Sequence, residues 1–128
     1  MKKLFTATLI ILTFSAFVNP LINDNIAKAL KAGNSAAVAN FFNTTVDLTL
    51  PNNEGVFSKA QAELILKTFF ANNKPSDFKV VHDGESKNNT LYSIGNLTTS
   101  SGVFRTYILY QEKGTNIVIL ELRIESEE

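Results

Sequence analysis

The second half of the chain constrains the fold more than any other feature of the sequence. Apolar and polar residues alternate through four successive segments, Phe78–Glu85, Leu91–Thr99, Val103–Glu112 and Asn116–Ile124. Short turns rich in Gly, Ser, Asn and Lys separate these segments. Alternation with a period of two, broken by such turns, is typical of strands joined by hairpins. The sequence therefore predicts a four-stranded antiparallel meander with one apolar face.

The beginning of the folded domain is predicted to be helical. Pro20–Ala32 carries apolar residues at helical spacing, and Asn23 or Asp24 can cap its first turn. Gly33 suits the left-handed position that ends a helix. A second short helix is predicted over Ala36–Phe42, so the first two elements form a helical hairpin.

Between the hairpin and the meander, the segment from residue 46 to residue 73 is predicted to form strand, turn and helix. Val46–Leu50 alternates as a half-buried strand, and Val56-Phe57 is a short strand or a hydrophobic staple. Ser58 and Gln61 match the pattern of a capping box. The helix that follows places its apolar residues on one face: Ala62, Ile65, Leu66, Phe69 and Phe70. Helices followed by a meander predict an α+β fold.

The first residues have the parts of a secretory signal peptide. Lys2 and Lys3 precede an apolar run, Leu4–Val18, and Asn19-Pro20 closes it. The alternative is a membrane anchor, but the run is shorter than the roughly 20 residues that a bilayer requires. The sequence thus predicts a signal peptide over residues 1–18 and one exported domain over residues 19–128, free in the periplasm or outside the cell.

Composition excludes several classes of function. Without Lys2 and Lys3, 10 basic residues face 12 acidic ones, and Arg105 and Arg123 are the only arginines. This balance argues against nucleic acid and against a polybasic membrane patch. The chain has no cysteine, which excludes disulfides, thiol nucleophiles and zinc held by cysteine. His82, the single histidine, shares the parity of Phe78 and Val80 and gives no metal site, so neither metal nor cofactor is expected.

The order of elements and several segments resemble a known family. The matching segments are ALKAGN at Ala29–Asn34, the pair Phe41-Phe42, VDLTLP at Val46–Pro51, EGVFSKAQAELILKTFF at Glu54–Phe70, YSIGNL at Tyr92–Leu97 and ELRIE at Glu121–Glu125. They resemble small secreted bacterial proteins of unknown function with a nuclear-transport-factor-2-like (cystatin-like, SnoaL-like) fold. The resemblance implies a cone made of a curved antiparallel sheet and closed by the N-terminal helices. It also implies that self-association through the open sheet is common, and it brings no catalytic residues.

Two interpretations are open for the polar residues on the strands. Asp47 points away from the apolar side of its own strand, as a surface carboxylate would, although related enzymes use such a carboxylate as a base. Arg105, Glu121 and Arg123 lie on two neighbouring strands and fit either cross-strand ion pairs or a patch that binds an anion. Tyr107 has the same parity as Arg105, and the rim of such a patch would include Tyr107 and Asp47.

Phenylalanines provide the other candidates. They fit an ordinary core, or an apolar pocket in the cone that begins with Phe57, Phe69 and Phe70. The first functional interpretation is a non-enzymatic domain that binds a small apolar ligand or a protein, including a second copy of itself. The alternative is an acid/base enzyme of the isomerase or hydrolase type. That enzyme needs two or more side chains to converge inside the cone, from the set Asp47, Tyr92, Arg105, Tyr107 and Glu121.

Overall fold

The computed structural model describes residues 22–127, and the predicted signal peptide lies outside them. The elements, in chain order, are α1 (Asp24–Ala32), α2 (Ser35–Ala39), β1 (Phe42–Leu50), β2 (Asn53–Ser58), α3 (Lys59–Asn72), β3 (Pro75–Glu85), β4 (Thr90–Thr99), β5 (Gly102–Lys113) and β6 (Asn116–Ser126). The predicted α+β fold and its four-stranded meander are confirmed.

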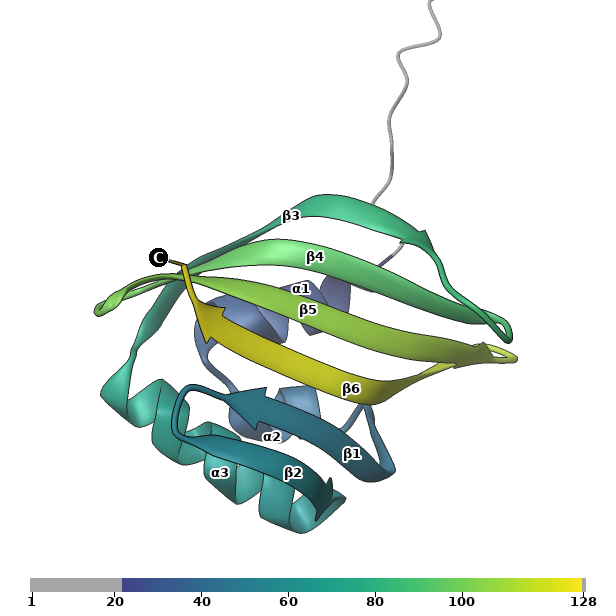
Figure 1. Cartoon of the computed structure of the whole chain (residues 1–128), viewed down its shortest axis with the longest axis horizontal. Coiled ribbons are helices and arrows are strands. Elements are labelled where there is room, and N and C mark those ends of the chain that lie inside the picture. Colours follow the sequence, from purple (N-terminus) through teal and green to yellow (C-terminus); the bar gives the residue numbers. More distant parts are fainter. Residues whose placement is uncertain (1–21, 128) are drawn as a thin grey trace, which may run out of the picture.

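The six strands form one curved sheet in the order β2-β1-β6-β5-β4-β3 (Figure 1). The meander pairs antiparallel throughout, as predicted, but β1 and β6 are parallel, with Asp47 opposite Glu121. A purely antiparallel sheet was therefore the wrong prediction. The helix α3 sets the direction of β3, and three hairpins then fix the direction in which β6 arrives beside β1. Local alternation carries no information about that long-range pairing.

The helices lie on one side of the sheet. α1 and α2 lie behind it in Figure 1, where α1 contacts β3, and α3 contacts β1, β2 and α2. Leu48, Leu122 and Ile108 are neighbours across β1, β6 and β5, and all three are fully buried on this side. We call it the covered face. The opposite side of the sheet, here called the open face, carries none of the helices within residues 22–127.

Helix boundaries follow the expected caps. Asn23 caps α1 by accepting from the backbone N–H of Asn25 at 2.7 Å, and Gly33 ends α1 with φ 65°. The Ser58 and Gln61 capping box at the start of α3 is confirmed. The second helix is shorter than predicted, because the chain leaves it early to join the sheet. Phe42 already pairs with Ile119 at the start of β1.

A bulge in β3 changes one predicted orientation. The register between β3 and β4 shifts between Val80 and His82, so that one extra residue, Val81, lies in β3. An inserted residue reverses the face of every side chain after it. His82 therefore lies opposite Ile94 on the open face, whereas its predicted parity with Val80 would have put it on the covered face.

Candidate functional site

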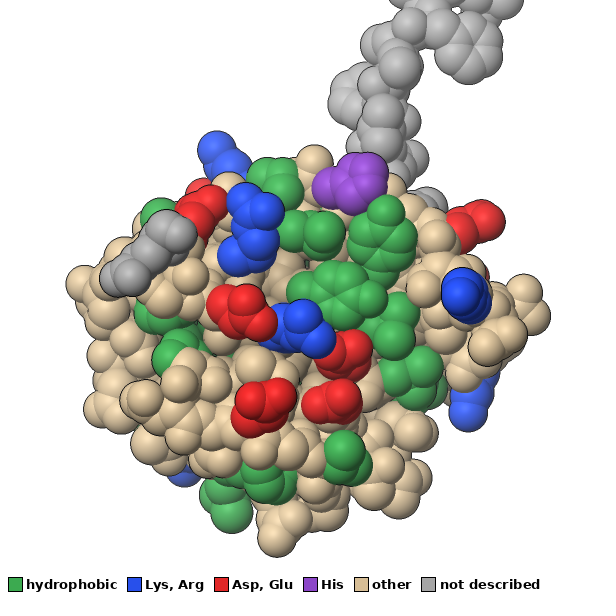
Figure 2. Space-filling model, viewed as in Figure 1, with side chains coloured by type: hydrophobic (Ala, Val, Ile, Leu, Met, Phe, Trp, Pro, Cys, Tyr) green, Lys and Arg blue, Asp and Glu red, His purple; other side chains and the backbone are tan. Residues whose placement is uncertain are grey.

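A continuous band of aromatic and charged side chains crosses the open face from β3 to β6. His82 Nε2 lies 2.9 Å from the hydroxyl of Tyr92, and the Tyr92 and Tyr107 rings stack with centroids 6.2 Å apart. The guanidinium carbon of Arg123 lies 5.8 Å from the centroid of the Tyr107 ring. Figure 2 shows hydrophobic side chains gathered on this face beside a cluster of acidic and basic ones. We call this arrangement the aromatic band.

Backbone features place the members of the band. The bulge at Val81 turns His82 to the open face. A Cβ atom on Gly84 would lie 2.6 Å from the hydroxyl oxygen of Tyr92, so the absence of a side chain there lets the Tyr92 ring lie across β3. Tyr107 and Arg123 are direct cross-strand partners on β5 and β6. Sequence patterning gave Tyr107 its correct parity, but it carried no signal for the bulge.

Ion pairs border the band. Arg123 Nη2 lies 2.9 Å from Glu121 Oε2, and Arg123 Nε lies 3.5 Å from Glu125 Oε1. Arg105 pairs with Glu127 at 3.1 Å, not with Glu121 as the cross-strand prediction allowed. The side chains of both arginines, Glu125 and Glu127 are about half exposed, and only Glu121 is more buried, so each pair contributes about 0–1 kcal/mol to stability. They define the charge pattern of the surface more than they hold the fold together.

The band also shifts two pKa values. Partial burial, and then the negative charge of Glu121, raise the pKa of Tyr107 above its usual value of 10.0, while Arg123 acts in the opposite direction. The hydrogen bond that Arg123 donates to the Glu121 carboxylate is the largest cause that raises the pKa of Arg123. Near neutral pH the band therefore presents a neutral phenol and a charged guanidinium.

The polar residues considered for an acid/base enzyme do not converge on the covered face. Asp47 is exposed beside Glu121, opposite the buried side of β1, as its parity predicted. Tyr92, Tyr107, Arg105 and Glu121 also lie on the open face, by their register with the buried residues. The geometric requirement of the enzyme interpretation is thus not met. Among residues 22–127, no group of three or more His, Asp or Glu side chains could hold a metal ion.

The three candidate pocket phenylalanines lie on the side of the sheet that carries the helices. Phe69 and Phe70 are buried on α3, and Phe57 is half-buried against the core. The Phe69 ring meets Phe104 edge to face at 5.2 Å. Phe70 belongs to the core and Phe57 packs against it, whereas Phe69 also forms part of a groove wall.

That groove lies between α3, the β1–β2 turn and the adjoining ends of β5 and β6, and has a volume of about 700 Å³. Its residues are Leu50, Pro51, Asn52, Asn53, Leu64, Ile65, Thr68, Phe69, Asn72, Asn73, Phe104 and Ser126. We call it the α3 groove. Nothing in the sequence indicates that the pairs Asn52-Asn53 and Asn72-Asn73 approach one groove.

No helix in the described part of the chain has the length and apolar character needed to cross a membrane.

Solved structures identify the class of fold. A designed nuclear-transport-factor-2 protein with a long sheet aligns with a TM-score of 0.62 and 13% identity, covering 79% of this chain and 94% of that one. A putative calcium/calmodulin dependent protein kinase II association domain from Xanthomonas campestris aligns with a TM-score of 0.60 and 18% identity, covering 81% of both chains. The chain has a nuclear-transport-factor-2-like fold.

Within that fold, the chain belongs to the DUF4783 family, a domain of unknown function, whose model matches residues 23–125. A DUF4783 protein from Bacteroides fragilis is 31% identical, with a TM-score of 0.75, and covers 83% of this chain and 99% of that one. One from Bacteroides ovatus is 27% identical, with a TM-score of 0.74, covering 84% and 97%. No curated protein matches the sequence. The resemblance identified from the sequence is confirmed at the level of family and fold.

Proposed function

We propose that this chain is an exported, non-enzymatic binding domain that associates with a second copy of itself through the open face. The observation that carries the proposal is the aromatic band, which lies on the sheet face that none of the described helices α1, α2 and α3 covers. Export rests on the predicted signal peptide. The closed cone implied by the family resemblance stays a prediction, and the proposed interface does not depend on it.

The centre of the open face has the composition of a protein interface. Tyr92 and Tyr107 offer stacked rings, and the half-buried Ile94 and Leu109 lie beside them on β4 and β5. Tyrosine and arginine are enriched in the well-packed centres of interfaces, where they account for much of the binding free energy. Arg123, which is already held against Tyr107, would enter such an interface with little loss of conformational freedom.

The charged residues around that centre are compatible with a second copy of this protein as the partner. Acidic Asp47, Glu54 and Glu121 occupy the β2, β1 and β6 side of the open face. Lys79 and Arg105 share a cross-strand row on the β3 and β5 side, where Arg105 is already paired with Glu127 and Lys79 is exposed. A two-fold axis through the aromatic centre would bring the acidic side of one copy over the basic side of the other. Contacts of Asp47 and Glu54 in one copy with Lys79 of the other would support a symmetric dimer.

The comparisons add limited support. The similar protein from Xanthomonas campestris is named as an association domain, and at 18% identity its likeness concerns the fold alone. It supports the view that this fold is compatible with assembly. The choice of the open face for this chain rests on its own residues.

The experiment is to measure the mass of the mature domain in solution, by light scattering on a sizing column, for the wild type and for Tyr107→Lys. Thr115→Lys, in the exposed turn between β5 and β6, introduces the same charge away from the interface. We expect a dimer for the wild type and for Thr115→Lys. We expect Tyr107→Lys to be monomeric, because a buried lysine without a partner costs several kcal/mol in an interface.

Circular dichroism must show that Tyr107→Lys keeps the fold of the wild type. A wild type that stays monomeric at high concentration contradicts the proposal. So does a dimer whose dissociation constant is the same in Tyr107→Lys and Thr115→Lys, since the interface would then lie elsewhere.

A further inference from the structure

The α3 groove has the features of a second, separate binding site. It opens between α3 and the β1–β2 turn, and its volume of about 700 Å³ lies within the range of roughly 300–1,000 Å³ typical of small-ligand sites. We infer that it binds an uncharged apolar ligand whose polar end offers both a hydrogen-bond donor and an acceptor, as a carboxamide does. The inference goes beyond the proposed self-association and does not depend on it.

The apolar part of the ligand has a defined surface to lie on. Phe69 and Phe104 are less than a tenth exposed and fix each other edge to face, and Leu50 is buried beside them. Leu64 differs, because it projects from α3 and is 61% exposed in the free protein. A ligand that covered Leu64 would remove apolar area from water, which contributes about 25 cal/mol per Å² buried.

The polar part of the groove consists of amides. Asn52 and Asn53 come from the β1–β2 turn, and Asn72 and Asn73 come from the end of α3. The Asn73 side chain donates to the backbone carbonyl of Phe69 at 3.0 Å and is thereby fixed in place. Every asparagine amide both donates and accepts, so such a rim suits a polar group that does the same.

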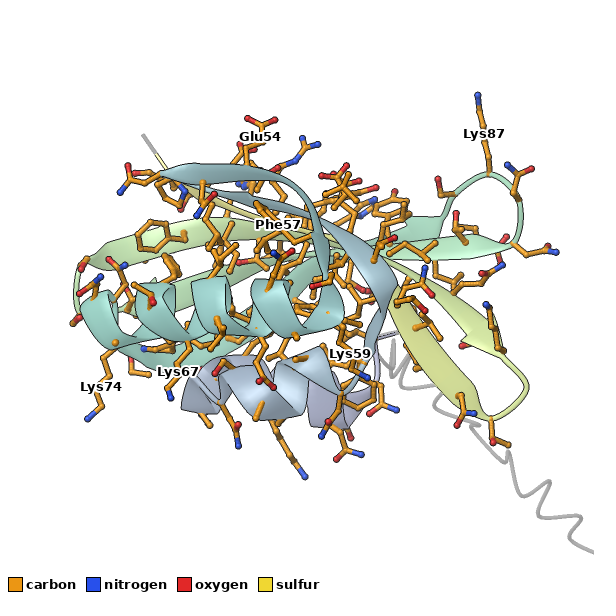
Figure 3. All side chains as sticks on the ribbon, turned by 90° about the horizontal axis from the view of Figure 1, so that it is seen from below. Glu54, Phe57, Lys59, Lys67, Lys74 and Lys87 are labelled. Atoms are coloured by element: carbon orange, nitrogen blue, oxygen red, sulfur yellow. The ribbon has the colours of Figure 1, made fainter. Side chains whose placement is uncertain are left out.

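Charge distinguishes this groove from the open face. Among residues 22–127, no Asp, Glu, Lys, Arg or His lines the groove, although Lys59, Glu63 and Lys67 lie elsewhere on α3. Lys67 and Lys74 lie close to the groove in sequence, but Figure 3 shows both pointing away from the sheet. An ionised ligand would lose hydration without gaining a counter-charge, so the groove should select against it.

The test uses the mature protein and two fluorescent probes with the same aromatic body. N-phenyl-1-naphthylamine is neutral, and 8-anilinonaphthalene-1-sulfonate carries one negative charge. We expect the neutral probe to bind at least about tenfold more tightly, because nothing in the groove compensates a sulfonate. Octanamide should then displace the neutral probe, whereas octanoate at the same concentration should not.

Two matched variants locate the probe. Leu64→Asp places a charge in the groove, and Val56→Asp makes the same change at an equally exposed apolar residue on the open face. We expect Leu64→Asp to weaken binding of the neutral probe by about tenfold or more, and Val56→Asp to leave it within about twofold. Both substituted residues are more than half exposed, so both variants should fold.

Three results would overturn the inference: no saturable binding of the neutral probe, equal displacement by octanoate and octanamide, or a loss of binding in Val56→Asp but not in Leu64→Asp. The last result would assign the probe to the open face. A failed dimerisation experiment leaves all these measurements intact, because they use a different face of the protein.

Discussion

The two faces of the same sheet differ sharply, although they are built from the same strands. On β6, Leu122 is fully buried on the covered face, while the next residue, Arg123, is about half exposed on the open face. The covered face carries an apolar row across three strands, and the open face carries stacked tyrosines and ion pairs. Because side chains alternate along a strand, one sequence can meet the needs of folding and of binding separately.

This difference predicts whether a substitution should change stability or association. Changes on the covered face should lower the free energy of unfolding with no specific effect on association. Changes on the open face should alter association while stability stays nearly constant. Neighbouring residues on one strand therefore provide their own controls.

The largest effect is expected from truncating the core on β6. Leu122→Ala removes a side chain with no exposed surface and should lower the free energy of unfolding by about 2–5 kcal/mol. Arg123→Ala, one residue along, should cost no more than about 1 kcal/mol, because Arg123 is itself about half exposed and solvent screens its ion pairs. Urea unfolding of the two variants, at a protein concentration where both are monomeric, measures the difference. Similar losses in the two would break the distinction between the faces.

A smaller effect is expected at two glycines on opposite faces. In Gly95→Ala, the new Cβ would lie 2.6 Å from the Phe78 ring and 2.7 Å from the backbone oxygen of Lys79. A backbone atom cannot easily move aside, so this variant should lose about 1–3 kcal/mol. In Gly84→Ala, the three nearest atoms all belong to the exposed end of the Tyr92 side chain, which can rotate away.

Thermal unfolding compares the two glycine variants, and we expect Gly84→Ala to have the higher midpoint. Displacement of the Tyr92 ring should also separate it from His82 and from Tyr107. Gly84→Ala should therefore weaken the dimer more than it weakens the fold. If Gly84→Ala proved the less stable of the two, the covered face would not be the more tightly packed one.

Local sequence patterns predicted most of the fold. The Ser58 and Gln61 capping box, the left-handed Gly33 and the hairpins of the meander were all predicted correctly, since each depends on a few neighbouring residues. The parallel pairing of β1 with β6 was not predictable in this way, because it joins distant segments of the chain. The extent of α2 was also wrong, because pairing of Phe42 in the sheet overrode its helical pattern.

The candidate site was predictable only in part. Parity correctly placed Asp47 opposite the apolar side of β1, and it correctly gave Tyr107 the orientation of Arg105. The bulge that turns His82 to the same face adds one residue without a clear sequence signal. The α3 groove was harder still, because its asparagines belong to two turns that only tertiary packing brings together.

The smallest and most specific effect is expected from removing the hydroxyl of Tyr110 on the covered face or of Tyr107 on the open face. Tyr110 is fully buried on the covered face, and its hydroxyl has no hydrogen-bond partner of good geometry in the described chain. Ser93, its polar neighbour, donates instead to Asp83 at 2.6 Å. Tyr110→Phe removes a buried polar atom that gains little from its surroundings, so stability at pH 7 should stay the same or rise by up to about 1 kcal/mol.

Alkaline pH separates the two hydroxyls further. Burial raises the pKa of Tyr110 above 10.0, so the folded protein holds this proton more tightly than the unfolded chain does. The resulting stabilisation is complete below the unfolded pKa, near 10, and is lost as the pH rises through the higher folded pKa. The free energy of unfolding should therefore fall above pH 10 in the wild type, and fall less steeply in Tyr110→Phe.

Tyr107→Phe should change this slope less, since Tyr107 lies at the surface beside Arg123, whose charge opposes the rise in the pKa of Tyr107. Chemical denaturation at several values from pH 8 to pH 11 measures this slope for each variant. If Tyr110→Phe and the wild type had equal slopes, the buried phenol would not lose its proton on unfolding.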